Sequence, residues 1–158
     1  MLIKVDHSDV TLRAFILFVQ TAHTVLKYAD AYLYRKVGLS TMKFIVLHVL
    51  ASNGGSMTPS EIAEWTYRER HNITTLVERM KQGGLVTAER SNRDKRFVNI
   101  ILTDKGRKTL KKTMPIAQDI INQAMSSISE SDTLLLEQSL QVLRQNAHDG
   151  LEEANKLS

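Results

Sequence analysis

The sequence predicts a mainly α-helical protein that contains one small β-hairpin. The 158 residues include only two prolines and seven glycines, which favours helix. Apolar residues recur every three or four positions at both ends of the chain, as they do on one face of a long helix. In the middle, two short runs rich in β-branched residues flank a polar loop, which is the pattern of a hairpin.

The N-terminal part of the chain predicts two helices. Apolar positions step by three and four from about Val10 to Lys36, and Gly38 ends this first helix. At 1.5 Å per residue the helix would be about 40 Å long, which is long for a compact domain of this size. Ser40 is a suitable N-cap for a second helix that runs to about Ser52, where a glycine-rich turn stops it.

Two further helices follow in the middle of the chain. The run from Thr58 to Glu61 has the pattern of a capping box, in which two side chains bind each other's backbone amides, and it predicts a short third helix. A fourth helix then carries apolar residues on one face and ends at Gly83. Thr66 and Glu69 repeat the capping pattern, which would start this fourth helix about one turn early.

The pattern changes after the fourth helix. Residues 85–90 and 97–102 are predicted as two strands, which the polar loop 91–95 joins into a hairpin with a charged tip. Thr103 opens another long helical stretch, in which Pro115 should produce a kink because it removes one backbone hydrogen bond. The predicted apolar stripe of this stretch is Leu110, Met114, Ala117, Ile121, Ala124 and Ile128.

The two ends of the chain have apolar faces that the middle cannot cover. Ser129 caps the predicted last helix, which carries an apolar stripe along its length, as the first helix does. An isologous dimer would bury both stripes. We therefore predict dimerisation regions at 1–38 and 105–158, on either side of a central domain at 39–104. Candidate dimerisation residues are Phe15, Phe18, Ala22, Ile121, Leu136, Leu140, Leu143, Ala147 and Leu151.

Positive charge is concentrated in one segment. The formal net charge is +4, but residues 68–112 hold 13 Lys and Arg against 5 Asp and Glu, and the rest of the chain sums to −4. Residues 40–102 are predicted to form three helices followed by two strands. An α-helix fits the major groove of B-DNA, and a hairpin with arginine at its tip can reach the minor groove. The sequence therefore predicts a winged helix-turn-helix domain that binds DNA.

Several short motifs in this region stand in the order found in a known family. They are Leu39-Ser40, Leu76-Val77-Glu78-Arg79-Met80, Gly84-Leu85-Val86, Arg93-Asp94-Lys95-Arg96, Leu102-Thr103 and Asp104-Lys105-Gly106. On these motifs the chain resembles the MarR (multiple antibiotic resistance regulator) family over residues 39–106. The long terminal helices match the layout of that family more loosely.

The resemblance implies a triangular homodimer whose winged domains contact successive major grooves of a pseudo-palindromic operator in double-stranded DNA. Arg93 would enter the minor groove at the wing tip, while Asp94 and Arg96 would brace the wing by ion pairing. Side chains near the start of the fourth helix would face the major groove, with Arg79 nearer a phosphate. The DNA-binding candidates are Arg68, Arg70, His71, Asn72, Thr74, Thr75, Arg79, Arg93, Asp94, Lys95 and Arg96.

The resemblance further implies a regulator of transcription, a repressor of a nearby operon that a small aromatic or anionic ligand releases. Trp65, Tyr67, Tyr28 and Tyr32 would then line an effector pocket. The alternative interpretation of these four aromatic residues is ordinary core.

Two departures from the pattern of the family concern how DNA would be read. Members usually carry an acid where this chain has Ser91, so the turn of the wing would be braced differently. They also tend to have Gly, Leu and Ser where this chain has Tyr67, Arg68 and Glu69. The altered turn keeps a second hypothesis open, a winged-helix protein-interaction module without specific DNA reading.

Other classes of protein find no support in the sequence. No nucleophile with a base, glycine-rich phosphate loop or metal-ligand cluster is visible, so we expect no enzyme activity, cofactor or metal. His7, His23, His48 and His148 share no metal-ligand spacing. The lack of cysteine excludes thiol redox sensing, and no run of about 18 apolar residues could cross a membrane. We expect a cytoplasmic protein.

Overall fold

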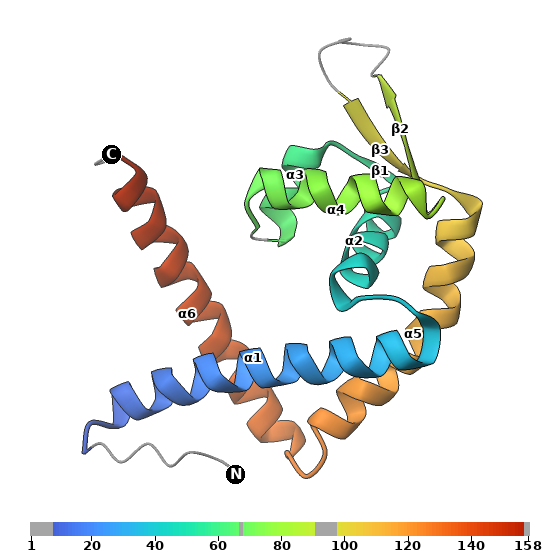
Figure 1. Cartoon of the computed structure of the whole chain (residues 1–158). Helices are drawn as coiled ribbons and strands as arrows, with labels where there is room; N and C mark the ends of the chain where they lie inside the picture. Colours follow the sequence, from blue (N-terminus) through green and yellow to red (C-terminus); the bar gives the residue numbers. More distant parts are fainter. Residues whose placement is uncertain (1–7, 67, 91–97, 157–158) are drawn as a thin grey trace. The chain divides into compact units, whose positions relative to one another are not determined.

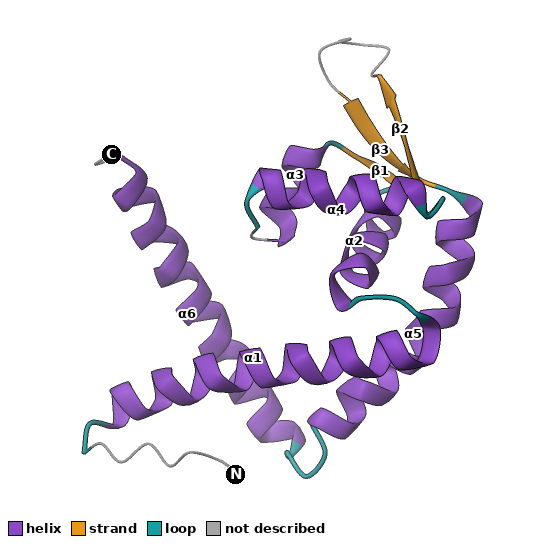
Figure 2. Cartoon of the chain, in the orientation of Figure 1, coloured by secondary structure: helices purple, strands orange, loops and turns teal. Residues whose placement is uncertain are grey.

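The computed structural model describes residues 8–66, 68–90 and 98–156. The chain forms two compact units, residues 1–121 and residues 122–158. Within the described residues, helices make up most of the chain and the strands form one small sheet, as the sequence predicts (Figures 1 and 2). The elements in chain order are α1 (Val10–Val37), α2 (Thr41–Ser52), β1 (Ser56–Met57), α3 (Pro59–Thr66), α4 (Arg70–Gln82), β2 (Val86–Arg90), β3 (Val98–Leu102), α5 (Asp104–Ala124) and α6 (Glu130–Lys156).

The predicted ends of the first two helices are confirmed by their caps. The Asp9 side chain accepts hydrogen bonds from the first amides of α1, and Gly38 ends the helix with a φ of 65°. This left-handed conformation strains any residue with a Cβ, which explains the glycine. At α2, the Ser40 hydroxyl accepts a hydrogen bond from the amide of Lys43 at 3.4 Å.

The capping box at the start of α3 is also confirmed. The Glu61 carboxylate accepts a hydrogen bond from the Thr58 amide at 2.7 Å, and the Thr58 hydroxyl accepts one from the Glu61 amide at 3.2 Å. The second capping pattern is wrong, because Thr66 belongs to α3 and its hydroxyl donates to the carbonyl of Ile62 at 2.7 Å. The residue at the N-cap of α4 is Glu69, whose side chain makes no capping hydrogen bond. Helix α4 therefore begins at Arg70, without the extra turn.

The sheet contains one strand more than the sequence predicts. Strands β2 and β3 pair antiparallel, with Val86 opposite Leu102 and Arg90 opposite Val98, so the hairpin is confirmed. Strand β1 pairs with the other edge of β3, which gives the order β1-β3-β2. Two residues are too short to show an alternating pattern, so the sequence carries no signal for β1.

The core of unit 1 lies between α2, α3, α4 and the sheet. Burying each large apolar side chain stabilises the fold by about 1.5–3 kcal/mol relative to leaving it exposed. Because one face of α4 belongs to this core, the opposite face is turned to solvent. Within the core, the most deeply buried side chains are Val46, Leu47, Val49, Leu50, Ile62, Ile73 and Met80.

Helix α5 buries a different face from the one that its apolar stripe predicts. Leu110 and Ala117 are buried as expected, but Met114 is 41% exposed, and the stripe misses the buried Thr113. A polar residue can occupy this position because its hydroxyl donates to the carbonyl of Thr109 at 2.8 Å. Pro115 lies inside the helix, and Figure 1 shows α5 bent along its length, in agreement with the predicted kink.

Unit 2 consists mainly of α6, the last helix. The Ser129 hydroxyl accepts a hydrogen bond from the Asp132 amide at 3.1 Å, which confirms the predicted cap. None of the described residues of α6 is buried, so its apolar stripe is open to solvent in the single chain. No described helix of either unit is long and apolar enough to cross a membrane.

Candidate nucleic-acid interface

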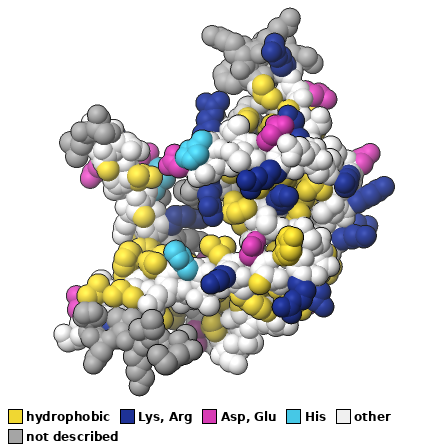
Figure 3. All heavy atoms as spheres, in the orientation of Figure 1, with side chains coloured by type: hydrophobic (Ala, Val, Ile, Leu, Met, Phe, Trp, Pro, Cys, Tyr) yellow, Lys and Arg dark blue, Asp and Glu magenta, His cyan; other side chains and the backbone are white. Residues whose placement is uncertain are grey.

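Helix α4 presents a polar face on the side opposite to the core. Its apolar residues Ile73, Val77 and Met80 are buried, which fixes the rotation of the helix about its axis. Leu76 is half-buried against the same core, whereas the residues on the opposite side of the helix are exposed. Figure 3 shows Lys and Arg side chains on the surface of unit 1 around this helix. The predicted DNA-contacting residues of α4 are all exposed: Arg70, His71, Asn72, Thr74, Thr75 and Arg79.

The arginines of α4 are available to an external anion. Arg70 and Arg79 form no ion pair with any carboxylate in the described part of the chain. The one acidic residue of the helix, Glu78, is instead paired with Lys81 at 3.0 Å. Its negative charge is therefore partly neutralised within the helix, and the exposed face remains positive.

The two threonines of α4 keep acceptor capacity on the same face. The hydroxyl of Thr74 donates to the carbonyl of Arg70 at 3.0 Å, and that of Thr75 donates to the carbonyl of His71 at 3.1 Å. Each hydroxyl oxygen retains lone pairs for a donor, and each methyl group can contact an apolar group. Both capacities suit the edges of base pairs, which present amino groups and the thymine methyl in the major groove.

The turn between α3 and α4 is partly described. The backbone amide of Arg68 donates to the carbonyl of Ala63 at 2.9 Å, which ties the turn to the end of α3, and the Arg68 side chain is exposed. The preceding residue, Tyr67, lies outside the described residues. Helices α3 and α4 with this turn form the helix-turn-helix that the sequence predicts.

The tip of the wing lies outside the described residues. Four predicted DNA-contacting residues, Arg93, Asp94, Lys95 and Arg96, belong to it, and their roles remain predictions. The described part of the wing ends at Arg90 on β2 and resumes at Val98 on β3. The two strands pair antiparallel, so Arg90 and Val98 lie opposite each other where the described part of the wing ends (Figure 1).

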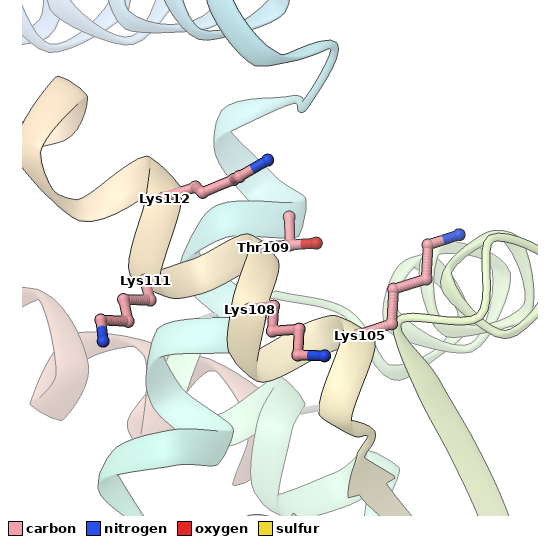
Figure 4. Close-up of a pocket in the computed structure, with 5 residues that line it drawn as sticks. All are labelled: Lys105, Lys108, Thr109, Lys111 and Lys112. Carbon is pink, nitrogen blue, oxygen red and sulfur yellow. The ribbon is translucent and has the colours of Figure 1, made fainter.

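The first half of α5 carries a lysine-rich surface that the sequence analysis counted as charge but did not assign to a site. Figure 4 shows its side chains pointing in different directions rather than toward one point. They therefore raise the local positive potential without forming convergent contacts to a small ligand. Five residues line this open hollow: Lys105, Lys108, Thr109, Lys111 and Lys112.

The predicted dimerisation residues lie on α1, at the end of α5 and on α6. Several are large apolar side chains that the single chain leaves open, such as Phe15 at 54%, Ile121 at 53% and Leu151 at 62% exposure. Exposed apolar side chains in such numbers are typical of a contact surface. Of the other candidates, Phe18, Leu136, Leu140 and Ala147 are exposed, while Ala22 and Leu143 are half-buried.

The aromatic candidates for an effector pocket do not form one cluster among the described residues. Tyr28 and Tyr32 lie one turn apart on α1, with ring centroids 5.9 Å apart. Trp65 on α3 is 51% exposed and has no aromatic partner among the described residues. It is therefore not part of the core of the single chain.

Comparisons with known proteins agree with this architecture. A family model described as the MarR family matches residues 37–96, from the end of α1 to the wing. The HTH-type transcriptional repressor IacR of Pseudomonas putida is 27% identical over 114 residues, which are 72% of this chain and 68% of that protein.

Two solved structures extend the similarity to the terminal helices. The organohalide-sensing transcriptional regulator RdhR, in its 2,4-dichlorophenol-bound form, has a TM-score of 0.77 and 26% sequence identity, over 92% of this chain and 88% of its own. A regulator from Streptomyces coelicolor, solved in complex with DNA, has a TM-score of 0.81 and 21% identity, over 90% and 92% of the two chains. The winged helix-turn-helix region of the chain, residues 37–96, thus matches the MarR family, and the whole chain is similar to transcriptional regulators of this fold.

Proposed function

We propose that the protein is a homodimeric repressor that binds a pseudo-palindromic DNA operator and is released by a small ligand. The observation that carries the proposal is the exposed face of α4. It combines arginines that have no carboxylate partner in the described chain with amide and hydroxyl groups suited to base edges. The relative from Pseudomonas putida, a repressor, supports the sign of regulation.

The helix would read DNA while the wing holds the backbone. Asn72, Thr74 and Thr75 lie in the first turns of α4, the part of a recognition helix that approaches base edges. Arg79, nearer the end of the helix, would contact a phosphate, and Arg93 would enter the minor groove. A regulator from Streptomyces coelicolor with the same fold was solved in complex with DNA, which supports DNA binding by this chain.

The apolar faces of α1 and α6 support the dimer. A monomer would leave these side chains in water, whereas an isologous contact buries the same surface twice. Two copies would place two α4 helices on one duplex, about one helical turn apart. The doubled net charge, +8, would strengthen the attraction to DNA.

The effector would be a small aromatic or anionic molecule. The regulator RdhR, which is 26% identical to this chain, was solved with 2,4-dichlorophenol bound, a ligand of this class. The tyrosine pair on α1 offers apolar rings to such a molecule.

The proposal is tested by fluorescence anisotropy with a duplex from the promoter of the neighbouring operon and a shuffled duplex of equal length. We expect the operator to bind at least about 10³-fold more tightly than the shuffled duplex. Operator affinity should also fall by about 10³ to 10⁵ between 50 and 200 mM salt. Equal affinity for the two duplexes would refute specific DNA reading.

A substitution in the wing distinguishes the two hypotheses, a DNA-binding regulator and a protein-interaction module. Replacing both Arg93 and Arg96 by Ala should abolish tight operator binding if the wing contacts DNA. The matched control replaces Lys108 and Lys111 by Ala, which removes the same charge from α5. If both double variants lose affinity equally, the wing tip makes no contact of its own.

A further inference from the structure

Thr103, the residue before α5, binds the turn that follows the recognition helix α4. The hydroxyl of Thr103 lies 2.7 Å from the carbonyl oxygen of Gly84 and 3.0 Å from that of Leu85, and it can donate to either. The same oxygen accepts a hydrogen bond from the amide of Gly106 at 3.0 Å. The amide of Thr103 also donates to Leu85, at 3.2 Å. One residue thus joins the start of α5 to the end of α4.

Lys105 adds a second bond at the same place. Its ammonium group donates to the carbonyl of Gly83 at 2.7 Å, and Figure 4 shows its side chain extending away from α5. Three successive carbonyl groups, from residues 83 to 85, are therefore all bound by Thr103, which precedes α5, and by Lys105 in its first turn. Such groups have no partner within the helix that they follow, so their partners decide how the chain leaves that helix.

The backbones of the two elements are in close contact as well. Gly106 is buried, and a Cβ atom at this position would overlap the carbonyl oxygen of Leu85 and crowd the Leu102 side chain. The contact leaves no room for α5 to slide along the end of α4. The relative position of these two helices is therefore set by direct backbone contact and by side-chain hydrogen bonds, which are directional.

We propose that Thr103 and Lys105 are positioning residues for DNA reading, and this inference rests on the proposed function. Neither touches a base. They hold the end of α4 in the place from which its side chains meet base edges. A bidentate hydrogen bond to a base tolerates little displacement, whereas attraction to phosphates depends weakly on orientation. Loss of the hydrogen bonds should therefore reduce sequence preference more than general DNA affinity.

The test compares Thr103→Val, which has nearly the same shape but no hydroxyl, with Thr103→Ser, which keeps the hydroxyl. We expect Thr103→Val to weaken operator binding about tenfold, because it removes one hydrogen bond and leaves a carbonyl group without a partner. Thr103→Ser should retain the wild-type affinity for the operator. Binding to the shuffled duplex should stay within about twofold, because the phosphate attraction is unchanged. Urea denaturation gives the folded fraction, for which each affinity is corrected.

Lys105→Met is a second variant that tests the same proposal if Thr103→Val does not fold. The matched control is Lys108→Met, which removes the same charge from the next turn of α5. We expect Lys105→Met to lower the ratio of operator to shuffled affinity by about threefold and Lys108→Met to leave it unchanged.

The outcomes separate the positioning role from the proposed function. If the folded variants lose both affinities in parallel, or retain the wild-type ratio, the positioning role is wrong while the proposed function stands. A wild-type protein with no operator preference would refute the proposed function and, with it, the role of Thr103 in specificity.

Discussion

The exposed side chains of α4 divide into two kinds, which would act on DNA in different ways under the proposed function. Arg79 carries a full charge that attracts any phosphate, so it would contribute affinity for every sequence. Asn72 carries a neutral amide that can donate to and accept from one base at once, so it would contribute discrimination. Both are exposed on the same helix, and they differ in what a substitution should change.

We predict that Arg79→Ala and Asn72→Ala have opposite signatures. With one phosphate contact in each protomer, Arg79→Ala should lower the slope of log affinity against log salt by about 1.8 in the dimer. Asn72→Ala should leave the slope unchanged but weaken operator binding by about 1–3 kcal/mol per contact. Anisotropy titrations at several salt concentrations measure both effects. Lys156→Ala, a charge-matched control on α6, should change neither quantity.

A second prediction at the residue scale concerns the capping box of α3. Thr58→Ala removes the hydroxyl that accepts from the Glu61 amide at 3.2 Å. We expect it to lower the free energy of unfolding by about 1 kcal/mol, as the loss of a threonine cap does elsewhere. Urea denaturation checks this value. Ser60→Ala in the same turn is the control, and an equal loss there would contradict the capping role.

At the scale of elements, the same residue type serves different purposes in two helices. Gly106 in α5 lies against the backbone of Leu85, where a side chain has no room. At Gly150 in α6, a Cβ would meet no atom within 4 Å outside the backbone of its own helix. In α5 the glycine permits a close contact between backbones, and in α6 it only lowers the helix propensity.

We therefore predict stability changes of opposite sign for two identical substitutions. Gly106→Ala should lower the free energy of unfolding by about 1–3 kcal/mol, because the added methyl group forces α5 away from Leu85. Gly150→Ala should raise it by about 0.5–1 kcal/mol, because alanine favours helix. Chemical denaturation followed by circular dichroism measures both. An unchanged free energy of unfolding for Gly106→Ala would contradict the close contact between α5 and the turn after α4.

At the scale of the whole molecule, the apolar residues of the terminal helices pose the main question. The winged part of unit 1 has its own core, whereas α6 has no buried residue in the described chain. Helix α1 likewise leaves apolar residues such as Leu17 and Phe15 exposed. A second copy of the chain would remove these surfaces from water, which is the physical basis of the proposed dimer.

The dimer is tested by substituting one residue of this surface. Leu140→Lys places a charge on α6 at a position that is 38% exposed in the single chain. We expect monomers in sedimentation velocity, because burying an unpaired ammonium group opposes association. Val98→Lys on β3 is the matched control, since Val98 is also 38% exposed, and it should remain dimeric. A dimer of Leu140→Lys would place the contact surface elsewhere.

The sequence by itself determined the elements whose signals act over a few residues. The caps at Ser40 and Ser129, the capping box at Thr58 and the glycine at 38 each end or begin a helix through bonds to nearby backbone. The hairpin and the polar face of α4 follow from local periodicity in the same way. The ordered motifs of residues 39–106 were enough to identify the family.

Only the tertiary structure decided the features that join distant parts of the chain. The pairing of β1 with β3, the burial of Thr113 and the bond from Thr103 to Gly84 depend on such contacts, and the last of these spans 19 residues. The start of α4 is another such feature, since the local capping pattern favours a start at Thr66 and the helix begins at Arg70 instead. Local chemistry sets where a helix can begin, and long-range packing sets which face it buries and what its ends bind.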